Sequence, residues 1–132
     1  MDRLFLDANV LFSAAYRADS GLLALWKLKN VALCSSHYAL EEARINLEHE
    51  DQRHRLQELS VSLHLFETAD RKLPHEISLP DKDAPIFLAA MEAQANYLLT
   101  GDLRHFGAYL GSKIAGIAIV LPAQYLKRRT QR

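Results

Sequence analysis

With 132 residues, 49% of them hydrophobic, the chain is long enough for one domain with a single core and too short for two ordinary ones. Sixteen lysines and arginines balance sixteen aspartates and glutamates. This balance excludes a global field that would draw the protein onto nucleic acid or an anionic membrane, so any site for a polyanion must be local. We therefore expect a single domain over residues 1–132.

The chain shows no pattern typical of export or membrane insertion. Its N-terminal MDRLFLD has an early acid and no basic region, so we expect no secretory signal peptide. No apolar run approaches the length of a membrane span. A single cysteine, Cys34, excludes an internal disulfide and is predicted to be a buried strand residue. These features favour a reducing cytoplasm as the location.

The first part of the chain alternates strand-like and helix-like patterns. An apolar run at residues 4–6 predicts a first strand, and Asp7 follows its end. An acid in that place is commonly a turn or cap residue, but it is also a candidate for function. Residues 20–28 have a broad apolar face and predict a helix, and residues 31–34 predict a second strand.

The next helix begins after Ser35 or Ser36, either of which is a suitable N-cap. It contains two neighbouring acids. On a helix, Glu41 shares a side with charged residues, whereas Glu42 lies on the side of apolar ones. Because an acid on the apolar side needs a reason, we favour Glu42 as the functional residue.

Residues 48–58 are heavily charged and predict a solvated helix face with its connection. His49-Glu50 begins a pattern similar to the zinc-protease motif H-E-x-x-H, but the second histidine, His54, comes one position late. The two rings then point to different sides of a helix, which excludes that motif. Residues 62–66 predict a third strand, and residues 67–80 predict a polar loop.

The segment 81–106, DKDAPIFLAAMEAQANYLLTGDLRHF, places one carboxylate before a helix and another after a strand. Asp83 is a suitable N-cap for a helix over residues 84–95. Residues 97–99 predict a short buried strand. Thr100-Gly101-Asp102 ends that strand abruptly, as parallel strands often end at a ligand crevice.

The rest of the chain predicts a short helix, a strand and a final helix. These are expected at residues 106–110, at residues 117–121 and from Pro122 onward. The last helix ends in a basic cluster: Lys127, Arg128, Arg129 and Arg132. Such a cluster is either a solvated helix end that complements the helix dipole or a contact for RNA.

Strands that alternate with helices predict an α/β fold, a three-layer α/β/α sandwich with a central, mainly parallel sheet. In such folds functional residues gather at the carboxyl ends of the strands, where Asp7 and Asp102 are placed. Asp83 and Glu42 can join them from the flanking helices. Acids gathered without matching basic residues raise one another's pKa unless a cation lies between them. Oxygen ligands of this kind suit Mg²⁺ or Mn²⁺ better than zinc.

Four segments in order make the chain recognisable as similar to a known family. They are LDANVLFSA at 6–14, EARINL at 42–47, DAPIFLAAMEA at 83–93 and LLTGDLRHF at 98–106. Together they resemble the PIN-domain family, and they look most like the PIN proteins that are toxins of toxin–antitoxin pairs. The resemblance extends over nearly the whole chain.

This resemblance implies a metal-dependent endoribonuclease that uses Mg²⁺ or Mn²⁺. It implies four acidic residues that bind the metal and are catalytic: Asp7, Glu42, Asp83 and Asp102. It implies two accompanying polar residues: Asn9 and Thr100. By the same resemblance we expect RNA as substrate, a homodimer and a small antitoxin protein as partner.

Positive side chains for RNA are sought close to the acids and at the end of the chain. Some relatives have another acid at the position of Arg104, so whether a second metal ion binds here stays open. Arg104 could instead contact a phosphate. The candidates for RNA binding are Arg104, His105, Lys127, Arg128 and Arg129.

Other functions fit the sequence less well. A haloacid-dehalogenase phosphatase normally has an aspartate where this chain has Asn9, and a receiver domain needs a lysine where this chain has Leu121-Pro122. The alternative from another class is a PIN fold that acts as a non-catalytic RNA- or protein-binding module.

Overall fold

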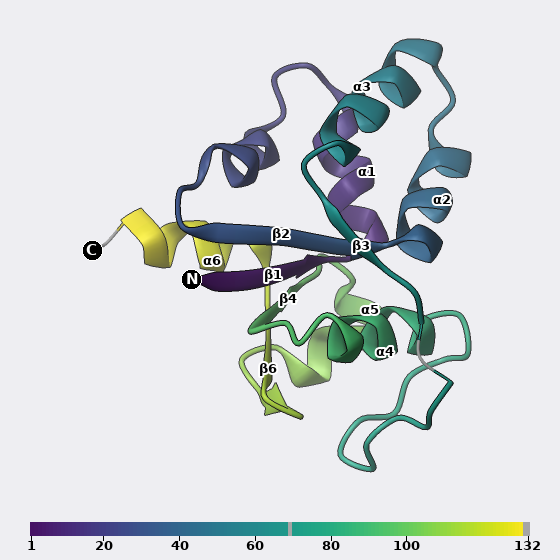
Figure 1. Cartoon of the computed structure of the whole chain (residues 1–132), viewed down its shortest axis with the longest axis vertical. Coiled ribbons are helices and arrows are strands. Elements are labelled where there is room, and N and C mark those ends of the chain that lie inside the picture. Colours follow the sequence, from purple (N-terminus) through teal and green to yellow (C-terminus); the bar gives the residue numbers. More distant parts are fainter. Residues whose placement is uncertain (69, 131–132) are drawn as a thin grey trace.

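The computed structural model describes residues 1–68 and 70–130, so Arg132 lies outside the described residues. Six strands form one sheet in the order β3-β2-β1-β4-β6-β5 (Figure 1). They are β1 (Asp2–Leu6), β2 (Val31–Ser36), β3 (His64–Phe66), β4 (Tyr97–Leu99), β5 (Lys113–Ile114) and β6 (Ile117–Val120). All neighbouring strands are parallel except β5 and β6. The predicted α/β fold with a mainly parallel sheet is confirmed.

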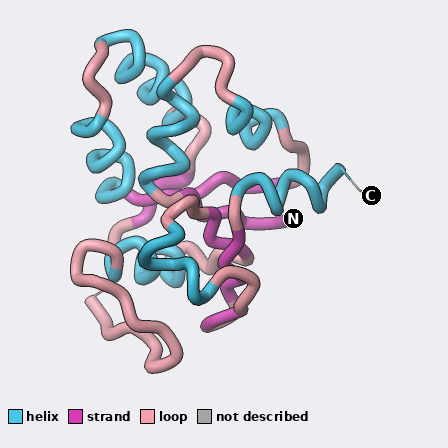
Figure 2. The backbone as a smooth tube through the Cα atoms, turned by 180° about the vertical axis from the view of Figure 1, so that it is seen from behind, coloured by secondary structure: helices cyan, strands magenta, loops and turns pink. Residues whose placement is uncertain are grey.

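Helices cover both faces of the sheet, which gives the three layers. The α-helices are α1 (Ala8–Tyr16), α2 (His37–Asn46), α3 (Glu50–Ser60), α4 (Ala84–Glu92), α5 (Leu103–Phe106) and α6 (Pro122–Thr130). Two 3₁₀ helices are η1 (Gly21–Lys27) and η2 (Gly107–Tyr109). Helices α1, α2 and α3 lie on one side of the sheet and α4 and α5 on the other, as the view from behind also shows (Figure 2). Among the described residues, no helix is long and apolar enough to cross a membrane.

Strand β1 is the central strand of the core. Leu4, Phe5 and Leu6 are fully buried, because a parallel strand covered on both faces needs a continuous apolar run. Cys34 on β2 is buried beside it, as predicted, and pairs in register with Phe5. The site that follows therefore stands at the end of a fully buried strand.

The order of the strands creates a crevice between β1 and β4. From β1 the chain proceeds outward through β2 and β3, and it then crosses back to place β4 on the other side of β1. At such a switch point the connections leave in opposite directions and open a space beyond the carboxyl ends. Asp7 follows the end of β1, and Asp102 comes shortly after β4.

Several helical segments differ from the sequence-based prediction. The short helix expected at residues 106–110 is replaced by α5, which ends at Phe106, and the 3₁₀ helix η2 directly after it. Residues 20–28, predicted as a helix, form the 3₁₀ helix η1 with Ser20 as its cap. The helix predicted over residues 84–95 ends at Glu92, since Gln94 adopts a positive φ of 52° and cannot continue a right-handed helix.

The strand β5 was not predicted. It pairs with β6 as a hairpin, and the two residues between them, Ala115 and Gly116, have φ values of 51° and 80°. Positive φ at both central residues is the geometry of a tight hairpin turn. The signal was missed because alanine rarely adopts this conformation, whereas asparagine or aspartate before glycine is the usual indication.

Candidate metal-binding site

A cavity of about 530 Å³ opens at the carboxyl ends of β1 and β4. Four carboxylates from separate segments line it: Asp7, Glu42, Asp83 and Asp102. Asp7 lies between β1 and α1, Glu42 on α2, Asp83 directly before α4, and Asp102 directly before α5. The structure thus brings together the four acids that the sequence analysis selected, while their role as metal ligands stays a prediction.

Asp7 is the most buried of the four, with 4% of its surface exposed. The backbone N–H of Ala8 donates to its Oδ1 at 2.7 Å, and the Thr100 hydroxyl donates to its Oδ2 at 2.7 Å. The Asn9 amide also donates to Oδ2, at 3.1 Å. Burial raises the pKa of Asp7 to about 6 in spite of these hydrogen bonds, and neighbouring acids add to the rise.

Asn9 and Thr100 connect the ends of the two central strands. The backbone N–H of Gly101 donates to Asn9 Oδ1 at 2.8 Å, and that of Asp102 donates to the Thr100 hydroxyl oxygen at 3.1 Å. A Cβ on Gly101 would lie 3.4 Å from Asn9 Oδ1, which is an ordinary van der Waals contact. These contacts hold the loop after β4 against the beginning of α1.

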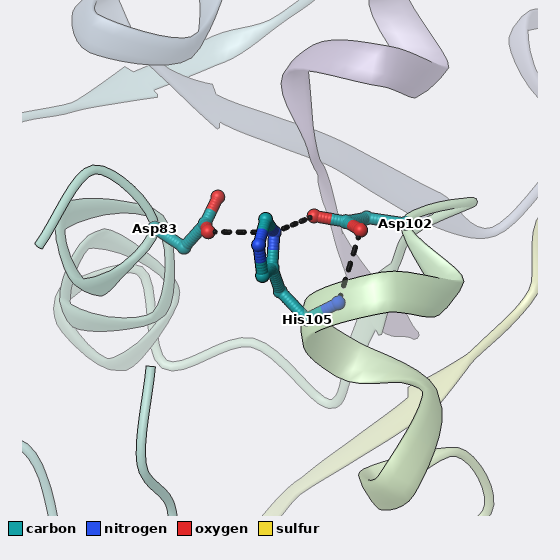
Figure 3. Close-up of side chains that lie close together, drawn as sticks. All are labelled: Asp83, Asp102 and His105. Carbon is teal, nitrogen blue, oxygen red and sulfur yellow. Dashed lines mark hydrogen bonds and ion pairs between the residues drawn. The ribbon is translucent and has the colours of Figure 1, made fainter. Parts of the chain in front are cut away.

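His105 lies between two of the acids (Figure 3). Its Nδ1 is 2.9 Å from Asp102 Oδ2 and 3.0 Å from Asp83 Oδ2, and its backbone N–H donates to Asp102 Oδ1 at 3.1 Å. One Nδ1 carries at most one hydrogen, so it can serve only one of the two carboxylates. The hydrogen-bond geometry favours Asp102, which leaves the buried Asp83 Oδ2 without a hydrogen-bond partner.

The surroundings of Asp83 and Asp102 shift the pKa values of their carboxyl groups in opposite directions. Burial raises the pKa of Asp83, and the nearby His105 opposes the rise only in part. Burial also acts upward on Asp102, but hydrogen bonds from the ring and backbone of His105 outweigh it, so the pKa of Asp102 lies below its usual range. Asp102 is therefore held as a carboxylate.

The neighbouring acids of α2 have different surroundings. Glu42 faces the cavity, and burial together with the charge of Asp83 raises its pKa. Glu41 is exposed and pairs with Arg44, with the nearest nitrogen and oxygen 2.6 Å apart. Ser36 caps the helix by accepting a hydrogen bond from the N–H of Ala39 at 3.0 Å, which resolves the choice between the two serines.

The candidates for RNA binding are divided between two ends of the sheet. Arg104 is exposed and lies two residues after Asp102. His105 makes the contacts with Asp83 and Asp102 described above, which were not predicted from the sequence. Lys127 and Arg128 are exposed on α6. Arg129 donates to the carbonyl of Lys29 at 2.6 Å, just before β2 begins. The basic cluster of α6 therefore belongs to the amino end of the sheet, away from the four acids.

Other residues at the site were not singled out from the sequence. The cavity is also lined by Phe12, Asn46 and Lys82. The contact of His105 with Asp102 did have a signal in the sequence. His105 lies three residues after Asp102 in a short helix that Asp102 caps, and this spacing places the two side chains on one face.

The donor set fits a divalent cation. Asp83, Asp102 and His105 each offer one ligand atom, and these atoms lie within 4.8 Å of one another. Asp83 Oδ2 is buried and accepts no hydrogen bond, although His105 Nδ1 lies 3.0 Å away. A buried oxygen in this state is costly, and a bound cation would give it a partner. With Asp7 and Glu42 lining the same cavity, the oxygen-rich set suits Mg²⁺ or Mn²⁺.

Comparisons with known proteins give one family match and several similar structures. The family model described as the PIN domain matches residues 3–104. No curated protein matches the chain. Among solved structures, that of VapBC2 from Rickettsia felis, bound to a DNA fragment from their promoter, contains a similar chain with a TM-score of 0.67. The two chains are 16% identical, and the match covers 89% of this chain and 96% of that one.

Two further structures are similar in fold. The crystal structure of FitAcB from Neisseria gonorrhoeae matches with a TM-score of 0.52 and 18% identity, over 91% of this chain and 98% of that one. The structure of FitAB bound to an IR36 DNA fragment matches with a TM-score of 0.51 and 17% identity, over 90% and 94% of the two chains. At such identities the likeness concerns the fold.

Proposed function

The chain belongs to the PIN-domain family, and on that premise we propose that it is a divalent-metal-dependent endoribonuclease, which hydrolyses phosphodiester bonds of RNA. The observation that carries the proposal is the convergence of four carboxylates in one cavity at the switch point of the sheet. These acids repel one another and a phosphate alike, so the cavity can receive a polyanion only with a cation between them.

Each acid has a role in the proposal. Asp7, Asp83 and Asp102 would hold Mg²⁺ or Mn²⁺, and Glu42 is either a further ligand or a base that acts through water. When bound, the ion lowers the pKa of a water and stabilises the negative charge that develops on the phosphate.

The surrounding residues fix the acids in place before RNA binds. The Thr100 hydroxyl and the Asn9 amide hold Asp7, and His105 holds Asp102 through its ring and its backbone. Orienting groups of this kind tune a ligand and limit its movement. Arg104, which is exposed and lies two residues after Asp102, would contact a phosphate of the substrate.

The proposal predicts different effects for two neighbouring glutamates. Purified protein should cleave single-stranded RNA with Mg²⁺ or Mn²⁺, and Glu42→Gln should lower the rate at least about tenfold, as removal of a ligand or base typically does. Glu41→Gln, one residue away on α2 but outside the cavity, should cleave like the wild type. The measurement is a time course on a labelled single-stranded RNA.

Chelation provides the control. Addition of EDTA should stop cleavage by the wild type, and excess Mn²⁺ should restore it. Cleavage that persists in EDTA, or equal rates for Glu42→Gln and Glu41→Gln, would show that these acids are not the catalytic site.

We further propose that the protein is the toxin of a toxin–antitoxin pair and acts on RNA in the cytoplasm. Support comes from the similar structures, which are those of VapBC2 and FitAB bound to DNA and of FitAcB. In this proposal the chain forms a homodimer and is inhibited by a small antitoxin protein that places side chains near the acids.

A further inference from the structure

We propose that Phe12 and Tyr16 of α1 form a stacking surface for unpaired bases of the substrate, beside the acidic cavity. The inference rests on the proposed nuclease function and deepens it, because it names what holds the strand next to the cleaved bond. None of the roles assigned above to the acids, Asn9, Thr100 or His105 includes contact with a base.

The two rings form a continuous stripe that begins at the acids. Phe12 lines the same cavity as the four carboxylates. Tyr16 follows four residues later with 52% of its surface exposed, and the two ring centroids are 5.4 Å apart at an interplanar angle of 36°. Four residues advance a helix by about 6 Å and return to nearly the same face. The stripe therefore continues from Ala8, next to Asp7, along α1 as it rises from the end of β1 (Figure 1).

A role in the core does not account for both rings. Phe12 packs against the buried core on one side and borders the cavity on the other. Tyr16 adds little to the core, since half of it faces solvent. A single exposed aromatic residue is ordinary, but here the exposed ring touches a second ring that lines a candidate catalytic cavity.

The chemistry of the cavity identifies the occupant. One part of its lining is acidic and accepts a phosphate only through a cation, and another part is apolar, made by Ala8, Phe12 and Ala43. A nucleotide supplies both groups that this lining needs: a phosphate and a planar aromatic base. The advance along α1 between the two rings is comparable to the length of one nucleotide in an extended strand, so neighbouring bases can use successive rings. Single strands are the matching substrate, because their bases are free to stack on protein side chains.

The test is a comparison of strands with and without bases. The probes are a fluorescein-labelled oligouridylate and an abasic ribose-phosphate strand of equal length, and the measurement is fluorescence anisotropy in Ca²⁺. Stacking on one aromatic ring typically changes affinity by roughly five- to hundredfold. The wild type should therefore prefer the strand with bases, and Tyr16→Leu and Phe12→Leu should each weaken that binding by such a factor. Their affinity for the abasic strand should change less than about twofold, since no base is lost there.

Two variants control for other effects of substitution. Tyr16→Phe keeps the ring and should retain the preference for bases, whereas Tyr16→Leu keeps apolar bulk without a ring. Val61→Ala removes a side chain that is 84% exposed and outside the cavity, and it should bind both strands like the wild type. Thermal melts confirm that each variant is folded, and light scattering reports its oligomeric state.

The outcomes separate this inference from the proposed function. Equal wild-type affinity for the two strands, with metal-dependent RNA cleavage intact, would overturn the stacking surface and leave the nuclease standing. Absence of both binding and cleavage would overturn both. Dissociation of an oligomer by Tyr16→Leu, with the preference for bases unchanged, would assign Tyr16 to a protein interface and overturn the inference.

Discussion

Asp7 makes the stability of the metal-free protein depend on pH. Because burial raises its pKa from 3.8 to about 6, the folded protein holds this proton more tightly than the unfolded chain does. Between about pH 4 and pH 6 the unfolded chain loses the proton first, so a rise in pH lowers the free energy of unfolding, by up to about 3 kcal/mol from this group. Asp7→Asn cannot ionise, and its free energy of unfolding should fall less over the same interval.

The measurement is urea unfolding of both proteins near pH 4 and near pH 7 in EDTA. Glu42, Asp83 and Asp102 titrate in both proteins, so their effects largely cancel in the difference. Above about pH 6 Asp7 is ionised in the folded protein as well, so its contribution no longer lowers the free energy of unfolding further. Mg²⁺ that binds the folded wild type should offset this loss of stability. If the free energies of unfolding of the two proteins change equally with pH, the pKa of Asp7 is not raised in the folded protein.

Helix α2 is the element that aims Glu42 into the cavity, and its N-cap is Ser36. Loss of the hydrogen bond from Ala39 N–H to Ser36 Oγ should cost about 1 kcal/mol of stability and loosen the first turns of α2. We therefore expect Ser36→Ala to lower RNA cleavage as well as the melting temperature. Cleavage should be measured well below the melting temperature, so that the protein is fully folded.

Ser20, the N-cap of another helix, offers a matched control for the removal of Ser36. It caps η1 by accepting a hydrogen bond from the N–H of Leu22 at 3.3 Å, and neither residue lines the cavity. Ser20→Ala should lower the melting temperature with little change in the cleavage rate of the folded protein. Equal loss of cleavage in Ser20→Ala and Ser36→Ala would mean that α2 has no special part in placing Glu42.

At the scale of the whole molecule, we expect a homodimer. Formal charges of the chain sum to zero, so two copies meet with little long-range repulsion. Besides the residues discussed above, large apolar side chains are exposed on two helices: Tyr38 and Ile45 of α2 and Leu103 of α5. Light scattering over a range of concentrations should therefore give twice the chain mass. A monomer at every concentration would remove the dimer without affecting the proposed catalysis.

Much of the architecture was predictable because its signals are local. The fully apolar run of β1 predicted a strand buried on both faces, and Asp7 directly after it was placed at a carboxyl end. Pro122 was correctly expected to open the last helix, where its missing N–H costs nothing. The preference for Glu42 over Glu41 came from helical periodicity, and the cavity contains the former and not the latter. That Glu42 serves catalysis stays a prediction.

Errors of the prediction have equally local causes. The hairpin of β5 and β6 was missed because Ala115 occupies a turn position that alanine seldom adopts. The 3₁₀ geometry of η1 was missed because its apolar residues are compatible with an α-helix as well.

The sequence by itself determined the alternation of strands and helices and the acidic residues that follow them, because both are patterns of neighbouring residues along the chain. That the four acids would gather was expected from the sequence, but only the tertiary structure decided which further side chains contact them. It placed the ring of His105 between Asp102 and Asp83, and it placed Arg129 at the amino end of the sheet, away from the acids. The contact of His105 with Asp83 and that of Arg129 with the Lys29 carbonyl join residues that are distant in the chain, and they depend on the order of the strands. The order of the strands follows from how all the helices and strands pack together, so it is not determined by any single segment of the sequence.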